Sequence, residues 1–130
     1  MSKILLSIEP CFVERILNGT KRFEFRKVIG RKKVTDIVIY CTSPVMKVVG
    51  EAKVSKTLID DPESIWKITC DYSGITKDFF DSYYSGKDLA VAYELGEIQR
   101  YPEPIDLRDI GVSCAPQSFM YLTDEARCSL

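Results

Sequence analysis

The sequence contains no histidine, and its five cysteines are scattered without a Cys-x-x-Cys pair. Structural zinc sites need clustered cysteine and histidine ligands, so we expect no metal site and no bound cofactor. An odd number of cysteines also argues against a disulfide framework, and we expect reduced thiols. Without histidine, nucleophile systems of the Ser-His-Asp or Cys-His type are excluded. Any acid–base chemistry must therefore use Lys, Glu, Asp, Tyr or Cys.

Long apolar runs and phosphate-binding loops are also missing. No stretch approaches the ~20 apolar residues that span a bilayer. The short apolar run near the N-terminus is interrupted by Glu9 and Pro10, so it does not resemble a signal peptide. We therefore expect a cytoplasmic protein with no membrane partner. Neither GxGxxG nor GxxxxGK[ST] occurs, which leaves dinucleotide-binding and Walker-type folds without support.

The residues that are present suit one domain with an uneven distribution of charge. The chain has 130 residues, of which 45% are hydrophobic, and a net charge of −1. Residues 1–59 carry twelve Lys and Arg against five Asp and Glu, whereas residues 60–130 carry six against fourteen. The most basic stretch is 21–33, with seven basic residues and one acid. Such a surface suits a phosphate-bearing partner, and the alternative is a solvated loop.

Hydrophobic periodicity predicts an α+β domain over residues 1–122, with a flexible tail at 123–130. The predicted strands span 3–8, 21–27, 35–42, 45–54 and 88–98. The predicted helices span 10–18 and most of 61–86, and 115–122 is predicted to form a last turn or short strand. This order favours a small curved mixed β-sheet or partly closed β-barrel, flanked by short helices.

Local patterns assign faces and helix ends. Asp61 and Thr76 are predicted N-caps, and Gly19 is predicted to end the first helix in a left-handed conformation. In the strand 21–27, Phe23 and Phe25 fall on one face and are predicted to be buried, while Arg22, Glu24 and Arg26 fall on the other face and are predicted to point outward. Trp66 and the aromatic residues of 79–84 are predicted to belong to the core, and the alternative is a platform on which bases stack.

Lys21, Glu24 and Arg26 form the most informative group. Lys21 lies at the junction between the predicted helix and the predicted strand. Glu24 and Arg26 share one strand face, about 6–7 Å apart. Arg26 can contact a phosphate or a nucleobase edge, and Glu24 can accept from an exocyclic amine. Lys21 offers a mobile positive charge. The alternative is a set of surface ion pairs, each contributing only ~0.2–1 kcal/mol.

A basic turn follows this group. Arg31, Lys32 and Lys33 come directly after Gly30, and they complete the electropositive stretch that begins at Lys21. We predict that these three side chains contact the phosphates of RNA or of a nucleotide.

Three segments carry a family resemblance: ERILNGTKRFEFRK, IVIYCTSPVMKVVGEAKV and APQSFMYL. Together they resemble the ASCH domain of the PUA-like superfamily over about residues 3–122, most specifically through the pattern helix-G-x-K-x-x-E-x-R. The resemblance implies a barrel-like fold with an RNA-binding cleft beside the first helix, in translation- or transcription-linked regulators. By position, Lys21, Glu24 and Arg26 would line this cleft. Ser43 and Gln117 are further candidates from the neighbouring segments.

Small acetylcytidine amidohydrolases of the same superfamily resemble the chain at the same pattern. In them the lysine activates a threonine three residues later, and a glutamate further along assists. This chain keeps the lysine as Lys21 but has Glu24 at the threonine position. Thr20 is a poor substitute because its spacing differs. A hydrolase would therefore have to use Lys21 or Glu24 to activate water.

Three functions are consistent with these residues. The first is an RNA- or nucleotide-binding module that uses a basic cleft. The second is a nucleoside or nucleotide amidohydrolase that uses Lys21 and Glu24. The third is a protein-interaction domain whose basic face binds an acidic partner. The expected ligand is RNA, a nucleoside or a nucleotide, and the oligomeric state is left open between a monomer and a weak dimer.

Overall fold

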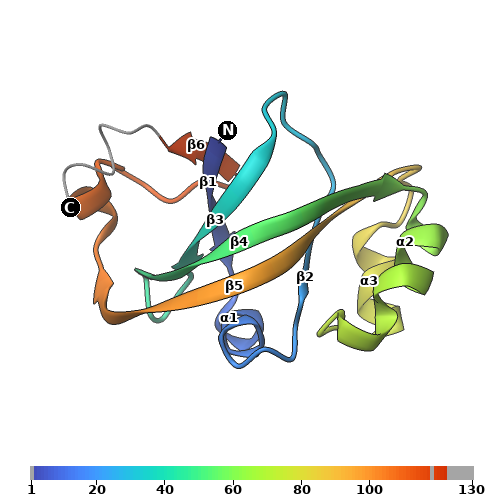
Figure 1. The fold of residues 1–130 in the computed structure, drawn as a ribbon, viewed down its shortest axis with the longest axis horizontal. Coiled ribbons are helices and arrows are strands. Elements are labelled where there is room, and N and C mark those ends of the chain that lie inside the picture. Colours follow the sequence, from blue (N-terminus) through green and yellow to red (C-terminus); the bar gives the residue numbers. More distant parts are fainter. Residues whose placement is uncertain (1, 118, 123–130) are drawn as a thin grey trace.

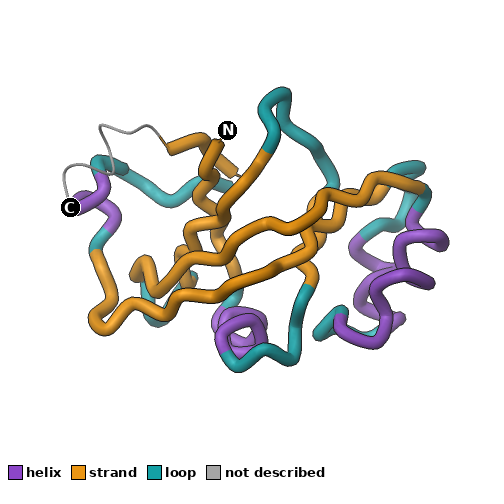
Figure 2. The backbone as a smooth tube through the Cα atoms, in the orientation of Figure 1, coloured by secondary structure: helices purple, strands orange, loops and turns teal. Residues whose placement is uncertain are grey.

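The computed structural model describes residues 2–117 and 119–122, and the predicted tail at 123–130 lies outside these described residues. They form one six-stranded sheet with three short α-helices and two 3-10 helices (Figure 1; Figure 2). In chain order the elements are β1 (Ser2–Ile8), α1 (Pro10–Leu17), β2 (Phe23–Arg26), β3 (Val34–Cys41), β4 (Lys47–Asp60), α2 (Pro62–Thr69), η1 (Cys70–Tyr72), α3 (Lys77–Tyr83), β5 (Ala90–Ile105), η2 (Leu107–Ile110) and β6 (Phe119–Leu122). No helix among the described residues is both long enough and apolar enough to span a bilayer.

The strand order is β2-β5-β4-β3-β1-β6, so the first strand of the chain lies beside the last described one. β1 and β3 are parallel, and all other neighbours are antiparallel. The long strands β4 and β5 run side by side through the molecule, with α2 and α3 at one end (Figure 1). The predicted α+β class with a small mixed sheet is confirmed. The sheet is not closed, because β2 and β6 form its two edges in the described part of the chain.

Local sequence signals place the helices as predicted. The side chains of Asp61 and Thr76 each accept a hydrogen bond from the backbone N–H three residues later, at 3.0 and 3.1 Å. α1 begins at Pro10, where a missing N–H breaks no helical hydrogen bond. It ends before Gly19, whose φ of +86° is left-handed. The caps therefore set where α1, α2 and α3 lie along the chain.

Strand β2 separates two parts of the core. Phe23 and Phe25 are each 6% exposed and pack with Ile65 and Phe80 of the helical end. On the opposite face of the sheet, α1 and the inward side chains of β1 and β3 form the main cluster. β5 shows the same division, because Ala92 belongs to the helical-end cluster and its neighbours in sequence belong to the main cluster. The predicted burial of both phenylalanines is confirmed.

The predicted ends of two strands are wrong. β4 runs past its predicted end at residue 54, and β5 continues to Ile105 through Pro102 and Pro104. Between its pairings with Val48 and Gly50, β5 has a register shift that contains both prolines. β2 pairs only with the first part of β5, so the later part is a sheet edge. A proline there breaks no ladder hydrogen bond, which is why the strand continues.

The packing of α3 on β2 can be tested through Phe80. This ring is 1% exposed and lies 4.8–5.3 Å from the rings of Phe25, Trp66 and Tyr84. Phe80→Ala should lower the free energy of unfolding by ~3–5 kcal/mol, because it leaves a cavity. Phe79 is 45% exposed, so Phe79→Ala is the control and should cost clearly less. Urea denaturation measures both, and equal losses would contradict this packing.

Candidate functional site

A cavity of about 230 Å³ lies between the end of β1, α1, β2 and the α3 region, and is called the cavity below. Lys21, Glu24 and Arg26 all line it, so the structure brings together the three residues that the sequence grouped. Its other lining residues are Ser7, Ile8, Glu9, Phe12, Phe25, Ile75, Phe79 and Tyr83. Charged groups and aromatic rings thus share one small space.

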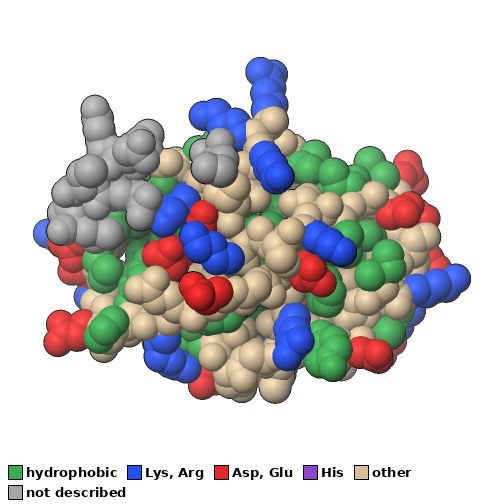
Figure 3. Space-filling model, in the orientation of Figure 1, with side chains coloured by type: hydrophobic (Ala, Val, Ile, Leu, Met, Phe, Trp, Pro, Cys, Tyr) green, Lys and Arg blue, Asp and Glu red, His purple; other side chains and the backbone are tan. Residues whose placement is uncertain are grey.

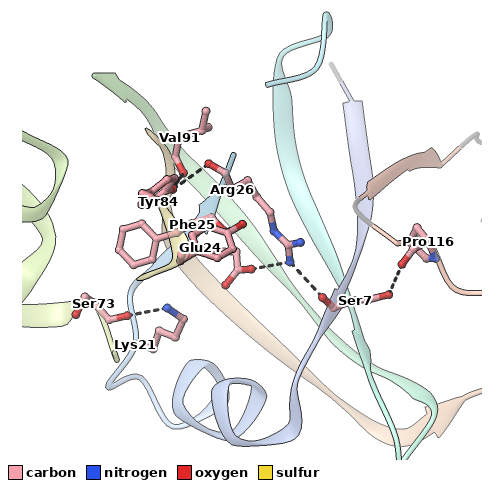
Figure 4. Close-up of polar contacts among 10 residues, drawn as sticks. Ser7, Lys21, Glu24, Phe25, Arg26, Ser73, Tyr84, Val91 and Pro116 are labelled. Atoms are coloured by element: carbon pink, nitrogen blue, oxygen red, sulfur yellow. Dashed lines mark hydrogen bonds and ion pairs between the residues drawn. The ribbon is translucent and has the colours of Figure 1, made fainter. Parts of the chain in front are cut away.

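Arg26 connects two strands that are not paired with each other. Its Nη2 lies 2.7 Å from Glu24 Oε2 and 3.2 Å from the carbonyl oxygen of Ser7, near the end of β1 (Figure 4). The hydroxyl of Ser7 donates in turn to the carbonyl of Pro116, at 2.8 Å. Arg26 Nε is buried and has no hydrogen-bond partner among the described residues. These contacts join β2 to β1 and hold the Glu24 carboxylate at the cavity.

The burial of this pair corrects the prediction that Glu24 and Arg26 face outward. The alternation is as predicted, since they lie on the face of β2 opposite to Phe25. Their side chains, however, are only 9% and 14% exposed. The reason is that β1 and α1 cover this second face of β2 and close over the cavity. The strand therefore has two buried faces instead of one.

Lys21 is held in place, which corrects the expectation of a mobile charge. The residue is 3% exposed, and its Nζ donates to the carbonyl of Ser73 at 2.7 Å (Figure 4). The ammonium also lies 4.8 Å from the ring centroid of Phe25 and 5.6 Å from that of Phe12. Its position is thus fixed by the turn before α3 and by two of the aromatic rings.

This environment changes the protonation of Lys21. Burial is the main cause that lowers its pKa from 10.5 to about 8. The negative charge of Glu24 opposes this shift, while Arg15 and Arg26 add to it. At neutral pH the side chain is a cation that gives up its proton more readily than an ordinary lysine. Such a group can donate hydrogen bonds or a proton to a ligand.

Aromatic residues that the sequence placed in the core form one wall of the cavity. The rings of Phe12 and Phe79 meet edge to face at 5.3 Å. The Tyr83 hydroxyl donates to a backbone carbonyl of β2 at 3.3 Å, and burial raises the pKa of Tyr83, which keeps the phenol neutral. Phe80 and Tyr84 do belong to the core. The i,i+4 pairs 79/83 and 80/84 define two adjacent faces of α3, and only one of them faces the core.

Arg31, Lys32 and Lys33 do not line the cavity. They are exposed in the loop between β2 and β3, where Figure 3 shows Lys and Arg side chains projecting from the surface. Together with Lys56 they line a groove of about 600 Å³, formed by residues 29–34 and 55–59 and called the basic groove below. The sequence predicted one basic cleft over 21–33. The structure instead divides these residues between the cavity and the basic groove.

The remaining candidates lie outside both sites. Ser43 and Gln117 are exposed, and neither lines the cavity or the basic groove. Gln117 follows Pro116, whose carbonyl binds the Ser7 hydroxyl, so its segment adjoins the cavity without contributing that side chain. Thr20 is exposed, and its hydroxyl contacts Asn18 Oδ1 at 2.8 Å rather than the cavity. Among the described residues, no group of three or more Cys, Asp or Glu side chains is placed to hold a metal ion.

Comparisons with known proteins agree with the fold. A family model described as "Domain of unknown function (DUF365)" matches residues 3–117. The crystal structure of ASCH from Zymomonas mobilis is similar at a TM-score of 0.89 and 26% identity, covering 98% of this chain and 92% of that chain. Similarity therefore extends over nearly the whole chain.

Two curated proteins are also similar in sequence. An "ASCH domain-containing ribonuclease" from Zymomonas mobilis is 29% identical over 126 residues, which are 93% of this chain and 84% of that protein. A "Large ribosomal subunit protein uL22" from Ureaplasma parvum is 36% identical over 120 residues, which are 92% of this chain. The chain spans 39% of the length of that ribosomal relative.

The cost of burying Lys21 can be measured with Lys21→Met, which removes the charge but keeps the length. Burial of an ammonium is unfavourable, so this variant should be at least as stable as the wild type at pH 7. The folded pKa of about 8 lies below the unfolded value of 10.5, so the unfolded chain binds more protons between them. Wild-type stability should therefore rise with pH in this window, and the advantage of the variant should shrink.

Urea denaturation of both proteins from pH 7 to pH 10.5 measures this difference. Groups other than Lys21 titrate in both proteins and cancel in the comparison. A variant that is less stable than the wild type by more than ~1 kcal/mol at pH 7 would mean that Lys21 is mainly a structural residue.

Proposed function

The chain belongs to the family described as domain of unknown function DUF365 and has the ASCH fold that its sequence predicted, and we propose that it binds single-stranded RNA. One observation carries this proposal. The cavity has aromatic walls, and a buried carboxylate, guanidinium and ammonium meet inside it. An unpaired nucleobase has the matching features, namely an aromatic face and an edge with hydrogen-bond donors and acceptors.

The charged residues suit the edge of a base. Arg26 is the one donor that bonds to the Glu24 carboxylate among the described residues, through Oε2, so Oε1 can accept from an exocyclic amine. Lys21 and Arg26 can donate to ring nitrogens or carbonyl oxygens. Phe12, Phe79 and Tyr83 offer rings for stacking. The cavity is smaller than the ~300–1,000 Å³ of drug-sized pockets, which suits a single base rather than a whole nucleotide.

The basic groove suits the RNA backbone. Four cationic side chains, Arg31, Lys32, Lys33 and Lys56, line it, and no acidic side chain of the described residues does. Tyr93 lies in the groove lining and is paired in register with Glu24 of the cavity, so the two sites adjoin across β2 and β5. A strand with one base in the cavity would place adjacent phosphates in the basic groove. The name of the Zymomonas mobilis relative, a ribonuclease, also supports RNA as the ligand.

RNA cleavage is a second candidate function, favoured by the proximity of Lys21 and Glu24. The Glu24 carboxylate could take the proton of a ribose 2′-hydroxyl, whose oxygen then attacks the adjacent phosphorus. The bond from phosphorus to the 5′-oxygen breaks, and Lys21 could give that oxygen its proton. The products would be a 2′,3′-cyclic phosphate and a 5′-hydroxyl. The lowered pKa of Lys21 suits this proton transfer near neutral pH.

The other expectations from the sequence stay predictions. Hydrolysis of an acylated cytidine would use Lys21 and Glu24 with water as the nucleophile, since Thr20 lies outside the cavity. A regulatory role in translation or transcription, and docking of an acidic protein on the basic groove, would use surfaces already described. Turnover of acylated cytidine, or binding of an acidic protein without RNA affinity, would favour these alternatives.

Glu24→Gln tests the cavity. The amide can still accept from Arg26, but it presents an NH₂ group instead of Oε1, so an exocyclic amine loses its acceptor. We expect discrimination between bases to fall by ~1–3 kcal/mol, while affinity for the backbone largely survives. If the protein cleaves RNA, the rate should fall by ~100-fold or more. Fluorescence anisotropy with homopolymeric oligoribonucleotides measures binding, and denaturing gels measure cleavage.

Glu103→Gln is the matched control, because Glu103 is exposed on β5 and lines neither site. An oligonucleotide with 2′-deoxyribose at the cleaved position separates cleavage by this mechanism from other hydrolysis, since it lacks the attacking hydroxyl. Unchanged base preference and unchanged turnover in Glu24→Gln would contradict the assignment of Glu24 to the site.

Replacing Arg31, Lys32 and Lys33 with Ser tests the basic groove. RNA affinity should fall, and the slope of log K against log salt should flatten by ~0.7 for each interaction with a phosphate that the substitutions remove. The control replaces Lys67, Lys87 and Arg108 with Ser, which removes the same charge from exposed positions elsewhere. If the control changes the salt slope as much, binding depends on net charge alone. If neither variant changes it, the loop is merely solvated.

A further inference from the structure

The turn before α3 binds the segment that carries Lys21 through three successive carbonyls. The ammonium of Lys21, the backbone N–H of Arg22 and the guanidinium of Arg15 donate to the carbonyls of the Tyr72–Gly74 turn, at 2.7, 2.8 and 2.6 Å. The ring of Tyr72 also lies under the Arg22 guanidinium, at 4.8 Å. One short turn is therefore hydrogen-bonded both to the end of α1 and to the two residues that precede β2.

Gly74 is shaped to accommodate the Lys21 side chain. Its φ is +71°, and a Cβ atom at this position would lie 2.5 Å from both Cβ and Cγ of Lys21 and 2.9 Å from its Cδ. Distances below 3.0 Å are not tolerated by real Cβ atoms, so one of the two groups would have to move. The aliphatic part of Lys21 thus occupies the space that any larger residue at 74 would need.

Ser73 supports the turn from inside. The residue is 1% exposed, and its hydroxyl contacts the carbonyl of Ile75 at 3.0 Å and the Ile75 N–H at 3.3 Å. These local contacts fix the turn that aims the Ser73 carbonyl at the Lys21 ammonium (Figure 4). An ammonium has three N–H donors, so this single contact leaves two for a ligand in the cavity.

We propose that Ser73 and Gly74 are positioning residues that hold the Lys21 ammonium at the wall of the cavity. A lysine has a long flexible side chain, and ordering it costs conformational entropy. Because the turn orders the Lys21 side chain in the folded protein, this entropy is lost on folding and not on ligand binding. The part of this inference that concerns RNA rests on the proposed function, whereas the part that concerns the state of Lys21 does not.

The turn also contributes to the burial that lowers the pKa of Lys21. The charged groups that act on this ammonium are Glu24 and Arg26 from β2 and Arg15 from α1. A substitution that displaces the ammonium toward solvent leaves these three residues in the chain but removes desolvation. The pKa should then move back toward 10.5.

The test is Gly74→Ala, with Gly86→Ala as its matched control. Gly86 has a similar φ of +76°, but a Cβ there would meet nothing within 4 Å. Both variants carry the same left-handed backbone strain, and only the first displaces Lys21. The readout is the pKa of Lys21 from the lysine ε-CH₂ signals in a ¹³C-NMR titration, with the signal assigned by its loss in Lys21→Arg.

In Gly74→Ala the Lys21 pKa should rise from about 8 by ~1 unit or more, and RNA affinity should fall by ~10-fold. Gly86→Ala should change neither. If Gly74→Ala does not fold, Ser73→Ala removes the support without a clash and should also raise the pKa. An unchanged pKa in a folded Gly74→Ala, or an equal rise in Gly86→Ala, would overturn the inference. A pKa shift in a protein that never binds RNA would refute the proposed function and leave the positioning role intact.

Discussion

Strand β2 is four residues long, and the pairing of those residues with β5 determines both the core and the site. In this register Phe25 lies opposite Ala92 and Glu24 lies opposite Tyr93. One face of the strand therefore holds the helices α2 and α3, and the other presents Glu24 and Arg26 to β1. A shift by one residue would move Glu24 and Arg26 to the face that packs on α2 and α3, and would put a carboxylate into the aromatic cluster. The packing of the core and the geometry of the candidate site thus depend on the same few hydrogen bonds.

Burying a charged group lowers the stability of the fold unless pairing and hydrogen bonds offset the loss of hydration. Arg26 and Glu24 satisfy each other in part, yet the guanidinium keeps a buried Nε without a partner among the described residues. Lys21 is buried with its ammonium against the carbonyl of Ser73, and this burial lowers its pKa. Replacing buried ionic groups with apolar ones often stabilises a protein, so stability alone does not account for this concentration of charge, and the proposed function assigns it to ligand binding.

Much of the fold and the membership of the site could be predicted from local patterns. Caps at Asp61 and Thr76, the alternation of β2 and the grouping of Lys21 with Glu24 and Arg26 all depend on residues close in sequence. The predictions that the structure corrected concern features that depend on contacts between segments distant in sequence. The burial of Lys21 requires the turn at Ser73, fifty-two residues later. The basic groove is separate from the cavity because its second side is formed by residues 55–59 of β4. The aromatic wall of the cavity depends on which of the two aromatic faces of α3 packs against the core.

If the proposed function is correct, the cavity and the basic groove bind one RNA strand as a continuous surface. An NMR titration of the ¹⁵N-labelled wild-type protein with a short single-stranded oligoribonucleotide tests this directly. Chemical shift changes should concentrate on Lys21–Arg26, on the loop 28–33 and on residues 55–59 of β4, which line the basic groove. Changes confined to the exposed faces of α2 and η2, or no changes at concentrations where RNA-binding domains saturate, would contradict a shared RNA-binding surface.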